Sequence, residues 1–182
     1  MLWEAVLLGL IIGWFRNGKL KNLGRISLPG WPLIFLAVLI QTVIWIDFTT
    51  GSDFLTPLYP ILYVLSFVVL VVFFFLQGRQ AGFIMIGFGI LLNLVVITAN
   101  RGMMPVDTDY MPTEVAEELE AGEKSPFHAP MTDETWLAFL GDRIRIPYRN
   151  QLLSIGDIVI GAGVIILIQN GMQGTKRKKQ WR

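Results

Sequence analysis

Cysteine is absent from the 182-residue sequence, and His128 is its single histidine. The absence of cysteine excludes disulfides and thiolate chemistry, and it leaves the redox compartment open. One histidine without acids at ligand spacing makes no metal site, so we expect neither a metal nor another cofactor. Phosphate loops, dinucleotide-binding motifs and nucleic-acid-binding patches are also missing, so no nucleic-acid partner is expected.

Charged residues are scarce as well. Asp, Glu, Lys and Arg make up 16% of the sequence and hydrophobic residues 53%, whereas about a quarter of an ordinary globular chain is charged. The runs 58–76 and 81–100 contain no charged residue, and each is long enough to cross a hydrocarbon core of about 30 Å as a helix. The composition therefore predicts an all-α, polytopic membrane helix bundle.

We expect about five transmembrane segments in a single membrane domain, residues 1–182. At about 1.5 Å per residue the first segment reaches only about 22 Å. It is therefore either a short span or a half-inserted helix at the membrane interface. Its Gly9 and Gly13 favour the close approach of a neighbouring helix. The segments lie at about residues 2–15, 30–50, 57–76, 81–100 and 154–171.

Lysine and arginine are sorted to one side of these segments. By the positive-inside rule that side is the cytoplasm, so the N-terminus lies outside and the loop 101–153 is extracytoplasmic. The loop holds ten acids against five bases. The basic tail 172–182 is interpreted as a topology anchor, with anionic-lipid binding as a second interpretation. Ten basic residues and no acid lie on the cytoplasmic side: Arg16, Lys19, Lys21, Arg25, Arg79, Lys176, Arg177, Lys178, Lys179 and Arg182.

This charge asymmetry also bears on transport. A chain so asymmetric inserts in one orientation, which argues against an antiparallel dimer. Five spans do not divide into two equal inverted repeats, the arrangement on which many transporters rely. A transport function would therefore need a parallel homo-oligomer or other membrane subunits.

The extracytoplasmic loop has the pattern of an ordered, small helical cap. Thr113 is placed to cap a helix that ends near Gly122. Thr132 is placed to cap a second, amphipathic helix that ends at Gly141. Charged and apolar residues then alternate over 142–148, which predicts an extended segment with one face on the protein.

Three polar clusters converge on the predicted outer face, at the end of the fourth segment, in the loop and at the start of the fifth. Structural roles explain part of this pattern, because Arg101 follows a helix stop and Asp157 forms a capping box with Ser154. The functional alternative is that Arg101 and Asp157 pair or bind a polar ligand. The candidate site residues are Asn100, Arg101, Met103, Pro105, His128, Asp142 and Asp157.

His128 has two interpretations. It either makes a structural hydrogen bond or acts as a general base oriented by Asp142. No nucleophile motif accompanies it. Within the membrane, four polar side chains fall at comparable depth and form a polar seam, used either for helix packing or as a substrate path. They are Gln41, Tyr63, Ser66 and Asn93.

Three short motifs occur in order along the chain: NRGMMPV from Asn100, LGDRIRIP from Leu140 and SIGDIVIG from Ser154. With them the chain resembles an uncharacterised bacterial family of small polytopic membrane proteins, held under a domain-of-unknown-function label and found mainly in Gram-positive lineages. The resemblance implies a location in the bacterial cell membrane and no particular activity. That family often has a small residue at the position of Arg101, which argues against a catalytic role for Arg101.

The sequence favours a non-catalytic function. We expect an accessory subunit or a small-solute- or lipid-handling permease component in contact with the membrane bilayer, with a polar binding site at the outer face. The alternative is a membrane enzyme that acts on an envelope lipid, with His128 and an aspartate as acid and base.

Overall fold

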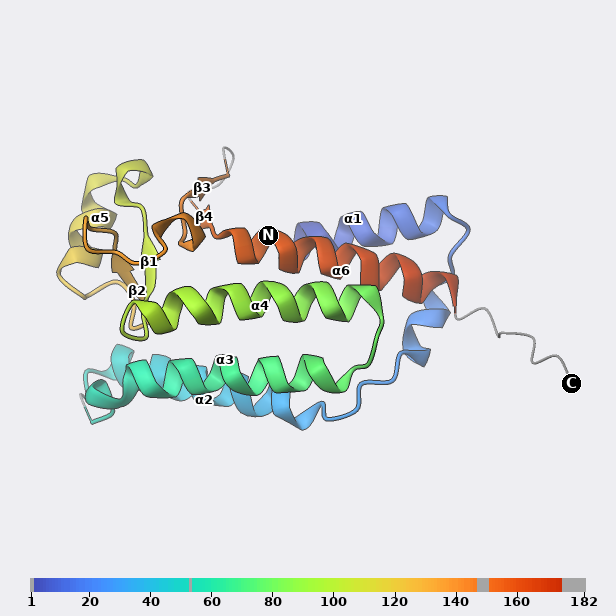
Figure 1. The fold of residues 1–182 in the computed structure, drawn as a ribbon, viewed down its shortest axis with the longest axis horizontal. Helices are drawn as coiled ribbons and strands as arrows, with labels where there is room; N and C mark the ends of the chain where they lie inside the picture. Colours follow the sequence, from blue (N-terminus) through green and yellow to red (C-terminus); the bar gives the residue numbers. More distant parts are fainter. Residues whose placement is uncertain (1, 53, 147–150, 175–182) are drawn as a thin grey trace, which may run out of the picture.

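The computed structural model describes residues 2–52, 54–146 and 151–174. It consists of long helices that run along one axis and a smaller cap at one end (Figure 1). The cap is made of the described residues of 101–153, and we call the opposite end of the bundle the basic end. The helices are α1 (Leu2–Phe15), α2 (Pro32–Thr50), α3 (Tyr59–Leu76), α4 (Ala81–Ala99), α5 (Thr113–Glu120) and α6 (Ile155–Gln173).

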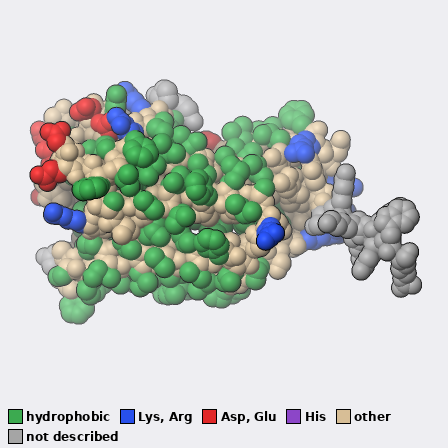
Figure 2. Space-filling model, in the orientation of Figure 1, with side chains coloured by type: hydrophobic (Ala, Val, Ile, Leu, Met, Phe, Trp, Pro, Cys, Tyr) green, Lys and Arg blue, Asp and Glu red, His purple; other side chains and the backbone are tan. Residues whose placement is uncertain are grey.

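Four helices are long and apolar enough to cross a membrane: α2, α3 with the 3₁₀ turn that precedes it, α4 and α6. The fifth apolar helix, α1, is shorter, with 14 residues. Large apolar side chains, such as those of Phe35 and Ile61, are exposed. Figure 2 shows hydrophobic side chains over much of the visible surface of the bundle. The predicted fold class, a polytopic helix bundle with about five apolar segments, is confirmed.

Glycines allow α6 to lie close to its two neighbours. A β-carbon on Gly89 of α4 would lie 2.5 Å from the carbonyl oxygen of Gly156 in α6, and one on Gly82 would lie 2.6 Å from the Leu167 side chain. On the other side of α6, a β-carbon on Gly9 of α1 would lie 3.0 Å from Ile168. The expected close neighbour of α1 is therefore α6. Because lipid tails are as apolar as the side chains, such close packing is a main source of helix association in membranes.

The cap joins the bundle through a buried apolar cluster at the cap end. Ile44 of α2, Tyr63 of α3 and Val96 of α4 pack there with Met104 and Leu140 from the cap. Phe127 also enters this region, because its ring stacks on Tyr63 with centroids 4.6 Å apart. The cap is therefore packed against three helices.

Two small sheets organise the cap. The strands β1 (Met104–Val106) and β2 (His128–Pro130) pair in parallel, and β3 (Ile144–Arg145) and β4 (Leu152–Leu153) pair antiparallel. The strand β3 confirms the predicted extended segment over its described part, while residues 147 and 148 lie outside the described residues. The helix α5 confirms the first predicted cap helix, although its N-cap is Pro112 and makes no side-chain cap hydrogen bond.

The second predicted cap helix, from Thr132 to Gly141, is wrong. This stretch forms turns and a 3₁₀ helix, Ala138–Leu140. Leu137 has a left-handed backbone, with φ of 54°. The N–H and carbonyl of Trp136 are both bonded to the side chain of Asn100, so they do not join a helical hydrogen-bond ladder. The long-range hydrogen bonds between Asn100 and Trp136 thus prevent the helix that the local sequence pattern favours.

Charge is segregated in space as in the sequence. Asp and Glu side chains gather over the cap in Figure 2. The described connections at the basic end carry no acid. Of the predicted tail 172–182, residues 175–182 lie outside the described residues. The basic side chains of these connections are Arg16, Lys19, Lys21, Arg25 and Arg79.

Candidate functional site

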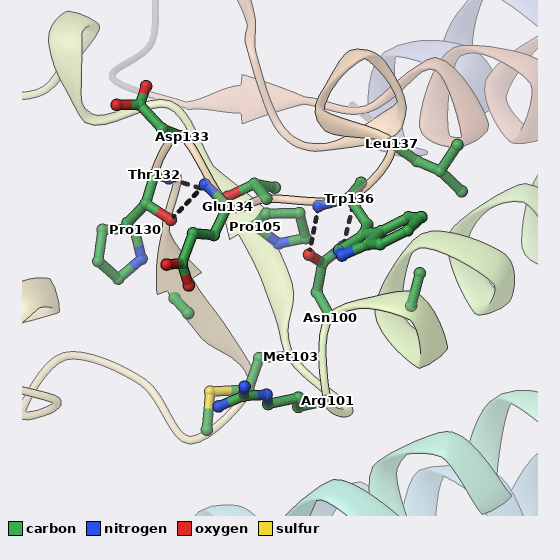
Figure 3. Close-up of a pocket in the computed structure, with 13 residues that line it drawn as sticks. Asn100, Arg101, Met103, Pro105, Pro130, Thr132, Asp133, Glu134, Trp136 and Leu137 are labelled. Carbon is green, nitrogen blue, oxygen red and sulfur yellow. Dashed lines mark hydrogen bonds between the residues drawn. The ribbon is translucent and has the colours of Figure 1, made fainter.

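The end of α4 opens into a groove on the cap, which we call the Asn100 groove. The cavity has a volume of about 940 Å³ and is lined by Asn100, Arg101, Met103 and Pro105 together with residues 129–137 other than Met131 (Figure 3). Arg101 and Gly102 take left-handed backbone angles, with φ of 57° and 83°. A β-carbon on Gly102 would lie 2.5 Å from Pro60, so this sharp exit from α4 needs glycine.

Asn100 is a structural clamp between α4 and the cap. Its Nδ2 donates to the carbonyl of Trp136 at 2.8 Å and to that of Val96 at 2.8 Å, and its Oδ1 accepts from the Trp136 N–H at 3.0 Å. Figure 3 shows the two bonds to Trp136 side by side. All the polar atoms of the Asn100 side chain are used, which explains the amide at this helix end.

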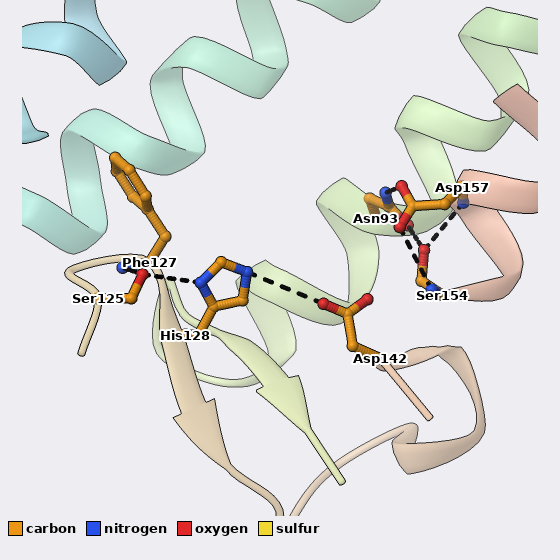
Figure 4. Close-up of polar contacts among 7 residues, drawn as sticks. All are labelled: Asn93, Ser125, Phe127, His128, Asp142, Ser154 and Asp157. Carbon is orange, nitrogen blue, oxygen red and sulfur yellow. Dashed lines mark hydrogen bonds and ion pairs between the residues drawn. The ribbon is translucent and has the colours of Figure 1, made fainter. Parts of the chain in front are cut away.

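The start of α6 is tied to the interior of α4. Ser154 accepts from the Asp157 N–H at 2.9 Å and Asp157 accepts from the Ser154 N–H at 3.3 Å, so the predicted capping box is confirmed. Asn93 joins it, because its Nδ2 donates to Asp157 at 3.0 Å and its Oδ1 accepts from the Ser154 hydroxyl at 2.9 Å (Figure 4). The carboxylate of Asp157 is therefore held by the side chain of Asn93 and by the backbone of Ser154.

The intramembrane polar residues form two separate groups. Gln41 donates to the Ser66 hydroxyl at 2.9 Å, and Ser66 donates to the Tyr63 carbonyl at 2.7 Å. Asn93 bonds to the start of α6, as described above. The expected single seam is thus divided between the α2–α3 pair and the α4–α6 pair.

A second cavity, the cap pocket, has a volume of about 470 Å³ and lies between α5, the two sheets and the first turn of α6. One part of its wall is apolar and the other is polar. The apolar side chains are Val106, Met111, Val115, Leu119, Leu152 and Leu153; the polar ones are Lys124, Ser125, His128, Asp142, Gln151 and Asp157.

His128 lies between a hydroxyl and a carboxylate in the cap pocket (Figure 4). Its Nδ1 is 2.8 Å from the Ser125 hydroxyl, and its Nε2 is 3.8 Å from Oδ2 of Asp142. Strand β1 sets this geometry, since it pairs with His128 on one side, while its Pro105 carbonyl accepts from the Asp142 N–H at 2.9 Å on the other. The expected approach of His128 to Asp142 is therefore present.

The electrostatics of this pair favour uncharged forms. Burial raises the pKa of Asp142 to about 7, and the negative charge of Asp157 adds to the shift. Burial lowers the pKa of His128, while Asp157 opposes that shift. Burial therefore disfavours the charged form of each group, the carboxylate of Asp142 and the imidazolium of His128.

One buried atom in the cap pocket is unsatisfied. Oδ1 of Asp142 has no hydrogen-bond partner among the described residues, although it is inaccessible to solvent. Buried polar atoms without partners are rare in folded proteins and call for an explanation, and a role in ligand binding is one. No group of three or more acidic, histidine or cysteine side chains within the described residues is placed to hold a metal ion.

The seven candidate residues are divided between two cavities. Asn100, Arg101, Met103 and Pro105 line the Asn100 groove. His128, Asp142 and Asp157 line the cap pocket, so Arg101 faces a different cavity from Asp157. Sequence reasoning missed Ser125 and the apolar wall supplied by α5; the Ser125-x-x-His128 spacing was the available signal for the serine.

Comparison with known proteins identifies the family of the chain. Residues 25–169 match the model of a family of unknown function, DUF5317. An uncharacterized protein of Thermotoga maritima is 28% identical over 169 residues, which cover 91% of this chain and 89% of that protein. No solved structure matches the chain. The family match covers most of the described structure, including both cavities of the cap, and the chain therefore belongs to the DUF5317 family of unknown function.

Proposed function

We propose that this protein is a membrane component, either an accessory subunit or a permease element. It binds an amphipathic small molecule or lipid in the cap pocket, which lies on the outer face of the cell membrane. The single observation that carries the proposal is the buried, unpartnered Oδ1 of Asp142. An atom of this kind accepts a hydrogen bond from a ligand that enters the pocket. The function is one of binding and needs no chemical step.

The pocket wall indicates the chemical class of the ligand. Asp142 and Asp157 bring two carboxyl groups to the polar side, and Lys124 is ion-paired with Glu118 at 2.7 Å. A head with N–H or O–H donors, such as a primary amine, satisfies Asp142. The apolar side formed by Val115 and Leu119 of α5 suits an alkyl portion. Mostly apolar pockets with a few convergent polar groups are typical of small-molecule sites.

A ligand test follows from the donor requirement. At pH 8, the purified protein in a neutral detergent is expected to bind hexylamine at least about tenfold more tightly than hexyltrimethylammonium, which has the charge but no N–H donor. Asp142→Asn is expected to lose this preference, because the amide removes the charge and half of the acceptor capacity. Isothermal titration calorimetry measures both affinities.

The matched control is Asp133→Asn, which changes an exposed acid of the Asn100 groove and leaves the cap pocket intact. This variant should bind hexylamine like the native protein. Equal binding of the two probes by the native protein, or a full preference in Asp142→Asn, would reject the proposed site.

Orientation is part of the proposal. The basic connections opposite the cap support a cytoplasmic basic end, because lysine and arginine are retained in the cytoplasm. The sequence has no cysteine, so each introduced cysteine is unique. In intact cells, a membrane-impermeant maleimide should label Glu123→Cys in the cap and label Lys21→Cys at the basic end only after lysis. Both positions are exposed. The reverse pattern would place the cap in the cytoplasm.

A membrane enzyme acting on an envelope lipid is the second candidate. It is favoured by the contact between the Ser125 hydroxyl and His128 Nδ1 at 2.8 Å. If Ser125 donates this bond, Nε2 of His128 carries the ring hydrogen and faces Asp142. Ser125 also accepts the Phe127 N–H at 3.2 Å, which gives it a structural role in the turn.

Ser125→Ala separates the two candidates. An enzyme that uses this hydroxyl would lose the hydrolysis of a fluorogenic short-chain phospholipid ester. A binding protein would show no Ser125-dependent hydrolysis and would retain the preference for hexylamine, since Asp142 is unchanged.

A further inference from the structure

The basic end contains a third cavity, with a volume of about 720 Å³. It lies where α3 ends, α4 begins and α6 ends, beside the 3₁₀ helix Leu20–Arg25 and the segment that follows it (Figure 1). We call it the basic-end cavity. Its polar lining consists mainly of amides and includes Arg25, Ser27, Gln77 and Gln80.

Gln77 lines this cavity and keeps one atom unsatisfied. The residue is 8% exposed. Nε2 donates to the carbonyls of Pro29 at 2.8 Å and Phe73 at 2.9 Å, and these two acceptors fix which end of the amide is nitrogen. Oε1 is therefore the free end, and it has no hydrogen-bond partner among the described residues. A ligand that satisfies Gln77 must present an N–H or O–H donor.

The other part of the cavity is suited to an anion. The first N–H groups of α4 have no intrahelical acceptor, and the side chain of Gln80, the N-cap, makes no cap hydrogen bond to them. Such a helix start attracts phosphate through its N–H groups and its dipole. Arg25 and Ser27 line the same cavity, and none of its described lining residues is acidic.

The helix ends at the cavity have dipoles of both signs. The ends of α3 and α6 carry the negative ends of their helix dipoles, and the start of α4 carries a positive end. The ligand that matches both is a phosphodiester followed by a positively charged or hydroxylated donor. This is the chemistry of a phospholipid headgroup.

The side chains that neighbour the cavity in the sequence are typical of the headgroup depth. The neighbouring Trp31 is 63% exposed and Phe75 is 78% exposed, and tryptophan is enriched where a membrane meets water. Basic pockets between transmembrane helices on the cytoplasmic side are known to bind lipid headgroups. We propose that the basic-end cavity binds the headgroup of a membrane phospholipid with a terminal hydrogen-bond donor, and that phosphatidylethanolamine fits it best. This site lies at the opposite end from the cap pocket and does not depend on the function proposed there.

The proposal is tested with phospholipids that share the phosphate but differ in the hydrogen-bond donor of the headgroup. In native mass spectrometry of the full chain, phosphatidylethanolamine is expected to bind about tenfold more tightly than phosphatidylcholine of the same acyl chains, because the trimethylated nitrogen has no N–H for Gln77. Phosphatidylglycerol, which has hydroxyl donors, should fall between the two. Equal binding of phosphatidylethanolamine and phosphatidylcholine would overturn the proposal.

Variants separate the two parts of the site. Gln77→Leu should bind both lipids with the affinity that the native protein has for phosphatidylcholine. Arg25→Gln should weaken both by a similar factor, about tenfold. Lys21→Gln is the matched control, since Lys21 is exposed on the same 3₁₀ helix but does not line the cavity. An Arg25→Gln protein that binds like Lys21→Gln would overturn the phosphate contact.

Gln77 also holds Pro29, so Gln77→Leu is checked by circular dichroism. If this variant does not fold, headgroup binding is tested by the lipid comparison in the native protein and by the Arg25→Gln result. Free glycerophosphoethanolamine distinguishes a lipid from a soluble phosphodiester. Binding of this compound as tight as that of the lipid would overturn the assignment to a membrane lipid, while much weaker binding supports it.

Discussion

Gly156→Ala is expected to destabilise the protein by about 3 kcal/mol or more, because a new methyl group has no room at the α4–α6 contact. A β-carbon at Gly156 would overlap the side-chain oxygen of Asn93 and lie 2.7 Å from the Gly89 carbonyl oxygen. Asn93 would then lose its bonds to Ser154 and Asp157. The loss is measured as a lower midpoint of unfolding, followed by circular dichroism in detergent.

Gly24→Ala is the control for the Gly156 prediction. A β-carbon at Gly24 would meet nothing within 4 Å, so its stability should change by less than about 0.5 kcal/mol. The double variant Gly156→Ala, Asn93→Ala should be destabilised by less than the sum of the single variants, since removing the amide makes room. Additive effects, or a Gly156→Ala protein as stable as Gly24→Ala, would show that this contact is not tight.

The second large effect is a pH dependence that comes from Asp142. Its pKa is raised to about 7 from an ordinary 3.8, so the folded state binds this proton more tightly than the unfolded state does. The stability that this proton provides is present in full below pH about 4 and is lost as the pH rises to about 7. At about 1.4 kcal/mol per unit of pKa, the upper limit of the loss is about 4 kcal/mol.

His128 acts in the opposite direction. Burial lowers its pKa, so the stability tied to its neutral form is present above its unfolded pKa and is lost as the pH falls through the lower folded value. The two effects partly cancel in the native protein. The stability of His128→Gln should therefore only fall as the pH rises. The stability of Asp142→Asn should only fall as the pH decreases.

These changes of stability with pH are measured as midpoints of unfolding between pH 4 and pH 8. Relative to the native protein, Asp142→Asn should become more stable as the pH rises over this range, whereas the exposed Asp133→Asn should follow the native curve. A constant difference between native and Asp142→Asn across the range would mean that Asp142 has no raised pKa in the folded protein.

Sequence alone was sufficient for the apolar helices and for local capping. Both ends of each of the four spanning-length helices lie within about two residues of the predicted segment. The Ser154–Asp157 capping box forms as its spacing indicates. Transfer of a segment into lipid depends on the sum of its own side chains, and a capping box depends on residues three apart. Neither needs information from elsewhere in the chain.

Tertiary structure decided which polar groups meet, and it overrode one local pattern. The pattern from Thr132 to Gly141 favours a helix, but Asn100, 36 residues away from Trp136, takes the backbone groups that a helix would use. The cap pocket likewise depends on β1 pairing with β2, which places His128 opposite Met104. Nothing in the spacing of these residues specifies that pairing.

The sequence by itself therefore determined that the chain forms an apolar helix bundle with its basic connections at one end and an acidic cap at the other. Only the tertiary structure decided that Asp142 is buried beside His128 and Asp157, and that Arg101 faces another cavity. The physical reason is range. Hydrophobicity and charge act residue by residue along the chain, whereas a binding site arises from groups such as Asn93 and Ser154, 61 residues apart, that only the packed fold brings within hydrogen-bonding distance.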